Sequence, residues 1–132
     1  MNLDMRAPSQ EAYRALTEIA QELETTYYIR ASSLVQELPS YIATWGLHRL
    51  AGDAQKYLQP RASEDTKYKG KIYRKFLGKL QSYSNIKFTA DEPKTLLEMP
   101  LREYTALNRL AIELSREWSF WATHVLGVAA EQ

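Results

Sequence analysis

Apolar residues recur every three or four positions through most of the chain, which is the period of an amphipathic helix. No segment of useful length alternates apolar and polar side chains as a half-buried strand does. The pattern therefore predicts an all-α protein, a compact bundle of about five to six helices forming a single domain over residues 1–132. A first stripe runs from Ala12 to Leu38, and its β-branched and aromatic run at 25–29 predicts a break or bend.

The segment at residues 38–47, Leu-Pro-Ser-Tyr-Ile-Ala-Thr-Trp-Gly-Leu, predicts a corner between helices. Pro39 has no backbone N–H and disfavours helical geometry at the residue before it. We therefore expect one helix to end at Leu38 and a short one to begin at Pro39. Gly46 then supplies a left-handed stop, or a place where another backbone comes close, before a helix over about 47–58.

Three further helices are expected in the second half of the chain, over about 64–84, over 94–98 and through the last apolar stripe. That stripe, from Tyr104 to Val125, spans barely three heptads, so it fits an intramolecular core seam better than a coiled-coil dimer. Phe120 projects almost opposite to it. This ring is either an exposed subunit contact that anchors a neighbouring protein, or it is covered by the N-terminal segment.

Charge is distributed unevenly, although the net charge is only +1. Residues 61–87 carry 8 basic and 2 acidic groups, and a helical wheel places most of these cations on one face of the helix expected at 64–84. A row of cations one turn apart can follow a phosphate backbone, and the neighbouring Tyr68 ring could stack on an unpaired base. The alternative is a solvated, lysine-rich face that only improves solubility. The predicted nucleic-acid contacts are Lys67, Lys71, Arg74, Lys75, Lys79 and Tyr68, with Arg30 and Arg49 as weaker candidates.

Two motifs resemble a known family. One is Leu-Pro-x-x-Ile-x-x-x-Gly-Leu at 38–47, and the other is the C-terminal series of Leu96-Leu97, Tyr104, Leu107, Leu110-Ala111, Leu114 and Trp118. Both are similar to the small all-helical subunit of CRISPR type III-B (Cmr) effector complexes, which serve RNA-guided antiviral defence. Small subunits of other CRISPR effector subtypes share the all-helical character. After Trp118 the family usually carries a basic segment, whereas Ser119-Phe120-Trp121 follows here, so no basic contact is transferred to this end.

The resemblance implies a non-catalytic, RNA-binding subunit. Its partners would be the CRISPR effector backbone and large subunits, neighbouring copies of itself along the filament, and the guide RNA and target RNA in the complex. Cleavage and signalling chemistry would belong to other subunits. A protein-only helical adaptor, whose basic helix docks on an acidic protein surface, is the main alternative.

The sequence offers little for catalysis. With no cysteine, thiolate metal sites and disulfides are excluded, and His48 and His124 form no recognisable metal or nucleophile motif. Glu18 and Glu22 lie one helical turn apart, which we interpret as a solvated face rather than a cation site. We expect no enzymatic activity, no cofactor, no metal and no small-molecule substrate. No apolar run approaches the ~18 residues of a membrane span, so we also expect a cytoplasmic protein with no membrane partner.

Overall fold

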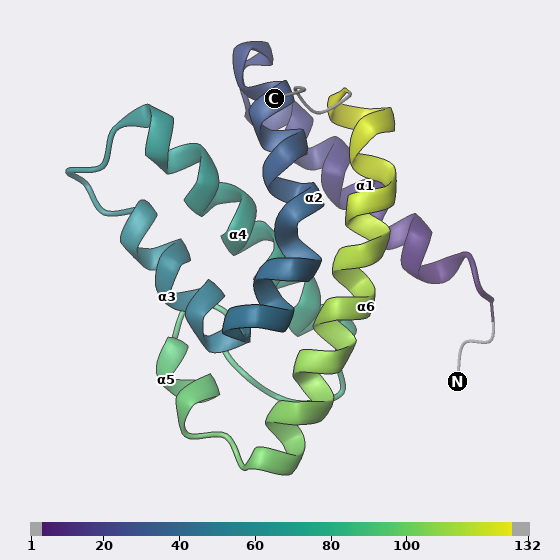
Figure 1. The fold of residues 1–132 in the computed structure, drawn as a ribbon, viewed down its shortest axis with the longest axis vertical. Coiled ribbons are helices and arrows are strands. Elements are labelled where there is room, and N and C mark those ends of the chain that lie inside the picture. The colour runs from purple at the N-terminus through teal and green to yellow at the C-terminus, as the bar shows by residue number, and fades with distance from the viewer. Residues whose placement is uncertain (1–3, 128–132) are drawn as a thin grey trace.

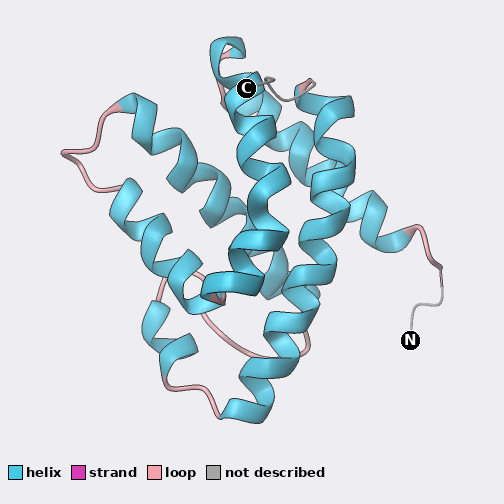
Figure 2. Cartoon of the chain, in the orientation of Figure 1, coloured by secondary structure: helices cyan, strands magenta, loops and turns pink. Residues whose placement is uncertain are grey.

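The computed structural model describes residues 4–127, and this part of the chain contains six α-helices and no strand. The predicted all-α bundle is therefore confirmed (Figures 1 and 2). The elements in chain order are α1 (Ala7–Glu22), a short 3-10 helix η1 (Thr25–Tyr27), α2 (Tyr28–Trp45), α3 (Leu47–Tyr57), α4 (Glu64–Tyr83), α5 (Pro93–Leu97) and α6 (Leu101–Leu126).

The centre of the bundle is the long helix α6, which packs most extensively on α2 and also on α1. Figure 1 shows α2 and α6 side by side along the long axis, with α1 passing behind α6. Helix α3 packs on α4, and α5 packs on α3. Trp118 and Phe76 meet edge to face with ring centroids 5.0 Å apart, and both side chains are fully buried. This contact joins α6 to α4 in the core.

The predicted stripe of α6 is partly buried at Tyr104, buried from Leu107 to Trp118, and then shifts by one position. Beyond Trp118 the buried residues are Ala122 and Leu126, whereas Trp121 and Val125 are only partly buried. The helical period of 3.6 residues does not match a strict repeat of seven, so over several turns the buried face drifts around the helix. The seam is intramolecular, because α1 and α2 cover it.

The predicted corner at Pro39 is wrong, because α2 continues through this residue to Trp45. A proline inside a helix costs about 3 kcal/mol, since it removes one hydrogen bond and crowds the preceding turn. Val35, Leu38 and Ile42 are fully buried on the same face of α2, where that helix packs on α6. Each such side chain contributes roughly 1.5–3 kcal/mol on burial, so tertiary packing outweighs the local preference for a break.

Two other predicted interruptions are confirmed. Helix α1 ends at Glu22, and η1 connects it to α2 within the run where a bend was expected. Gly46 separates α2 from α3 with a φ of +88°, which is a positive-φ stop. The start of α3 is fixed against α6, because the Asn108 side-chain oxygen accepts a hydrogen bond from the Leu47 N–H at 2.9 Å.

The second half of the chain also follows the expected boundaries. Helix α4 covers the predicted span to within one residue, and the loop that follows is anchored by Phe88, which is 6% exposed. The brief helix expected at 94–98 is α5, and Pro100 is the capping residue that precedes α6. Among the described residues, no helix combines the length and the apolar character needed to cross a membrane.

Candidate nucleic-acid interface

Helix α4 has the two faces that its sequence predicts. Its apolar face is in the core, and its basic face lies at the surface. The predicted cations differ in exposure, however: Lys71 and Arg74 are exposed, whereas Lys67, Lys75 and Lys79 are partly buried. The apolar residues of α4 in the core are Tyr68, Ile72, Tyr73, Phe76, Leu77 and Leu80.

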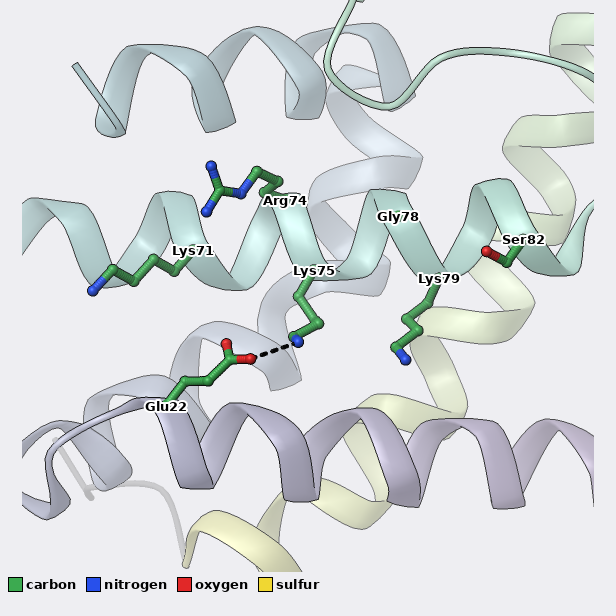
Figure 3. A pocket seen from close by; sticks show the side chains of 7 residues that line it. All are labelled: Glu22, Lys71, Arg74, Lys75, Gly78, Lys79 and Ser82. Atoms are coloured by element: carbon green, nitrogen blue, oxygen red, sulfur yellow. Dashed lines mark hydrogen bonds and ion pairs between the residues drawn. The ribbon is translucent and has the colours of Figure 1, made fainter.

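Most of the basic face lines one open cleft between α1 and α4, with a volume of about 570 Å³ (Figure 3). Lys75 and Lys79 point toward α1, whereas Arg74 points away from it, so positive charge extends over the outer surface of α4. Neither Lys67 nor Arg30 is part of the lining. The cleft is lined by Glu22, Lys71, Arg74, Lys75, Gly78, Lys79 and Ser82.

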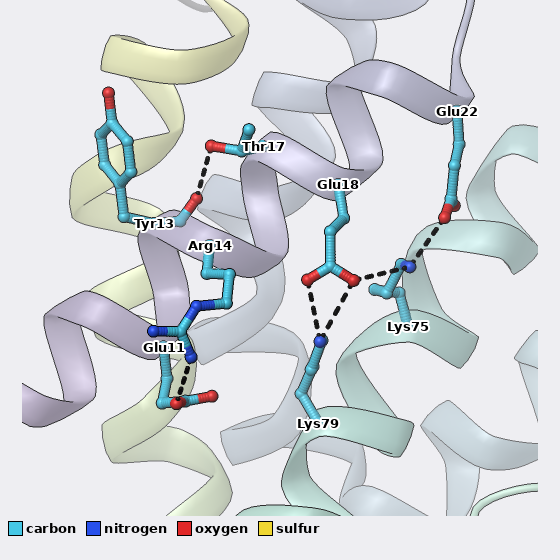
Figure 4. Close-up of polar contacts among 8 residues, drawn as sticks. All are labelled: Glu11, Tyr13, Arg14, Thr17, Glu18, Glu22, Lys75 and Lys79. Atoms are coloured by element: carbon cyan, nitrogen blue, oxygen red, sulfur yellow. Dashed lines mark hydrogen bonds and ion pairs between the residues drawn. The ribbon is translucent and has the colours of Figure 1, made fainter.

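Two carboxylates of α1 neutralise part of this face. The Lys75 ammonium lies 2.8 Å from a carboxylate oxygen of Glu22 and 3.5 Å from one of Glu18. The Lys79 ammonium donates to both oxygens of Glu18, at 2.9 and 3.2 Å. Figure 4 shows the Glu18 carboxylate between the two ammonium groups. Glu18 and Glu22 therefore lie on a face that is still partly in water, as interpreted from the sequence, but they form ion pairs with α4 that the sequence did not show.

The ion pairs shift the titration of the groups that form them. The hydrogen bond from Lys79 lowers the pKa of Glu18, because it favours the ionised carboxylate. Burial alone would lower the pKa of Lys75, but its bonds to Glu22 and Glu18 outweigh burial and raise it. Of the four cations of α4 that line the cleft, only Lys75 and Lys79 are paired with these two carboxylates, which leaves the two positive charges of Lys71 and Arg74. The surface therefore still attracts anions.

The predicted role of Tyr68 in base stacking is wrong, because its side chain is only 7% exposed. Its ring packs against the ring of Tyr27 in η1, with centroids 5.2 Å apart, and burial raises the pKa of its hydroxyl. The guanidinium of Arg30 lies 4.7 Å from the Tyr27 ring centroid and 3.7 Å from the Asp65 carboxylate. The helical wheel placed Tyr68 beside the basic face correctly, but it could not show that η1 covers this position.

The other weak candidate, Arg49, lies in α3 and outside the cleft. Its guanidinium lies 4.9 Å from the ring centroid of Trp45, an aromatic side chain that is 52% exposed. His48, one residue earlier, is 2.6 Å from the Tyr104 hydroxyl through its Nδ1 atom. Of the predicted contacts, the structure thus gathers Lys71, Arg74, Lys75 and Lys79 into one site and leaves the others apart.

Phe120 is exposed, as the first of its two predicted roles requires. The ring is 62% exposed and meets Trp121 edge to face, with centroids 4.9 Å apart. Tyr13 of α1 packs on Trp121 rather than on Phe120. The part of the N-terminal segment that the structure describes, from residue 4 onward, therefore does not cover the Phe120 ring. The expectation of a subunit contact itself stays a prediction.

Sequence reasoning missed a second apolar surface, near the junction of α5 and α6. Leu97 is 66% exposed and Leu101 is 78% exposed. Both line a hollow of about 250 Å³ together with Met99, His48 and other neighbours. The sequence feature that could have predicted this surface is that Leu97 and Leu101 fall outside the regular apolar stripe of the last helix.

Comparisons with known proteins do not place the chain in a family: no family model, no curated protein and no solved structure matches it. The resemblance to the type III-B small subunit therefore rests on the two sequence motifs. Within residues 4–127, no group of three or more histidine or acidic side chains is arranged to hold a metal ion.

Proposed function

We propose that this protein is the non-catalytic small subunit of a type III-B CRISPR (Cmr) effector complex and helps to hold target RNA through the basic face of α4. The observation that carries the RNA contact is the pair of exposed cations, Lys71 and Arg74, in a cleft that keeps two positive charges. The two sequence motifs and the all-helical fold support the choice of family.

In this proposal the protein binds the RNA backbone and does not catalyse a reaction. Lysine and arginine side chains bind phosphate oxygens through charge-assisted hydrogen bonds, which position a strand without selecting its sequence. The partners would be the backbone and large subunits, neighbouring copies of the chain, and guide and target RNA in the cytoplasm. Weak binding by the isolated subunit fits this role, because only two cations of the cleft are both exposed and free of the α1 carboxylates.

The phosphate contact is tested by replacing Lys71 and Arg74 with glutamate and measuring binding of single-stranded RNA over a range of salt concentrations. The logarithm of the binding constant falls linearly with the logarithm of the salt concentration, and we call the steepness of this line the salt slope. Each lost phosphate contact should reduce the salt slope by about 0.7, so the double variant should lower it by roughly 1.4. Arg102→Glu with Arg109→Glu is the matched control, because both arginines are exposed on α6 and lie outside the cleft. Equal losses in the two double variants would contradict a local contact at α4.

The complex is tested separately, by isolating tagged protein from its native cells and identifying the bound proteins and RNA. Recovery of CRISPR backbone subunits with a repeat-derived guide RNA would support the family, and the accompanying subunits would define the subtype. Recovery of unrelated proteins without RNA would refute it.

A protein-only helical adaptor is the second candidate, and the exposed apolar side chains favour it. Phe120, Leu97 and Leu101 present apolar area at two separate places on the surface. Digestion of RNA before purification separates the two functions. An adaptor keeps its protein partners after digestion, whereas a subunit held mainly by a nucleic-acid strand loses them.

A further inference from the structure

The carboxylates of α1 occupy the positions that phosphates would take on half of the basic face. Glu18 and Glu22 are one turn apart on α1, and they face Lys75 and Lys79, which are one turn apart on α4. A carboxylate and a phosphate use the same ammonium hydrogen-bond donors. A strand that approached Lys75 or Lys79 would therefore compete with groups that are already bound.

These contacts are exchangeable, because they are not deeply buried. The side chain of Glu22 is 54% exposed and that of Glu18 is 35% exposed. Ion pairs that remain partly in water contribute little to stability. The position of α1 depends instead on its apolar face, which packs mainly on α6 through Ala12, Ala15, Leu16 and Ile19.

We propose that Glu18 and Glu22 are internal competitors that limit how strongly α4 binds a phosphate backbone. With the carboxylates in place, a strand contacts Lys71 and Arg74. When the carboxylates are neutralised, the same strand also contacts Lys75 and Lys79. This inference rests on the proposed RNA contact of α4, and it adds the element that controls the strength of that contact.

The test is Glu18→Gln with Glu22→Gln, measured with fluorescently labelled poly-uridine as the probe. Two additional phosphate contacts should make the salt slope steeper by about 1.4, so the affinity advantage over the wild-type protein should fall about sevenfold between 50 and 200 mM salt. The control is Glu37→Gln with Glu113→Gln. This pair removes the same charge from exposed positions that form no ion pair within residues 4–127.

A second measurement follows the two lysines directly. Acetylation of Lys75 and Lys79, read by mass spectrometry, should be faster in Glu18→Gln with Glu22→Gln than in the wild-type protein, while Lys71 is unaffected. Because the apolar face of α1 is unchanged, the circular dichroism spectrum should stay helical.

An unchanged salt slope in Glu18→Gln with Glu22→Gln would overturn the inference, as would an equal change in the control pair. A different result would refute the proposed function: Lys71→Glu with Arg74→Glu would bind RNA as strongly as the wild-type protein does. If neither the wild-type protein nor the glutamine variant binds poly-uridine at any salt concentration, both the inference and the RNA contact are wrong.

Discussion

Gly46 is the residue whose substitution tests the fold most directly. Its φ of 88° and ψ of 160° lie in a backbone region that is essentially restricted to glycine. A Cβ atom at this position would be 2.5 Å from the Tyr104 hydroxyl and 3.0 Å from two atoms of the His48 ring. Gly46→Ala therefore combines backbone strain with a steric clash at the junction of α2, α3 and α6.

The cost follows from these two contributions. The backbone conformation costs an alanine about 1–3 kcal/mol. Displacing the Tyr104 hydroxyl weakens its 2.6 Å contact with His48, a hydrogen bond worth about 0.5–1.5 kcal/mol. We expect Gly46→Ala to lower the free energy of unfolding by about 2–4 kcal/mol. At about 3–5 °C for each kcal/mol in a domain of this size, the melting temperature should fall by roughly 6–20 °C.

Thermal unfolding followed by circular dichroism measures the effect, with Gly52→Ala as the control. Gly52 lies inside α3 without a positive φ, and a Cβ there would meet nothing within 4 Å. This variant should gain about 0.5–1 kcal/mol, because alanine is the better helix former. In a Tyr104→Phe background, Gly46→Ala should lose the clash with the hydroxyl and keep the backbone cost and the close contacts with the His48 ring. A melting temperature for Gly46→Ala at or above the wild-type value would refute the reasoning.

Two further predictions concern α2 and the α1 carboxylates. Pro39→Ala restores the missing helical hydrogen bond of α2, so denaturant unfolding should show a gain of about 1–3 kcal/mol, and a loss would contradict the packing described for this helix. The folded-state pKa of Glu18 is lowered from 4.5, so the stability that its ion pairs contribute is complete above pH 4.5 and is lost as the pH falls through the folded-state pKa. Unfolding midpoints of wild-type protein and Glu18→Gln should therefore differ most at neutral pH and converge in acid, and a constant difference would rule out this linkage.

The sequence by itself determined the helices and the chemistry available to them. Apolar periodicity is a local property, so it located α1, α3, α4, α6, the break after α1 and the stop at Gly46, although it ended α2 at Leu38 instead of Trp45. The same periodicity identified the basic and apolar faces of α4, because residues three and four apart on a helix share a side. The distribution of charged residues along the chain predicted that positive charge would gather on the helix at residues 64–84.

Tertiary structure alone decided which of these charges remain available. Glu18 and Lys79 are 61 positions apart in the chain, and only the packing of α1 against α4 brings them into contact. The matching spacing of two acids on one helix and two bases on another was the only hint in the sequence. Tyr68 is buried because η1 covers it, and Pro39 stays helical because α2 packs along α6. In each case, contacts between distant segments outweigh a preference that belongs to the local chain.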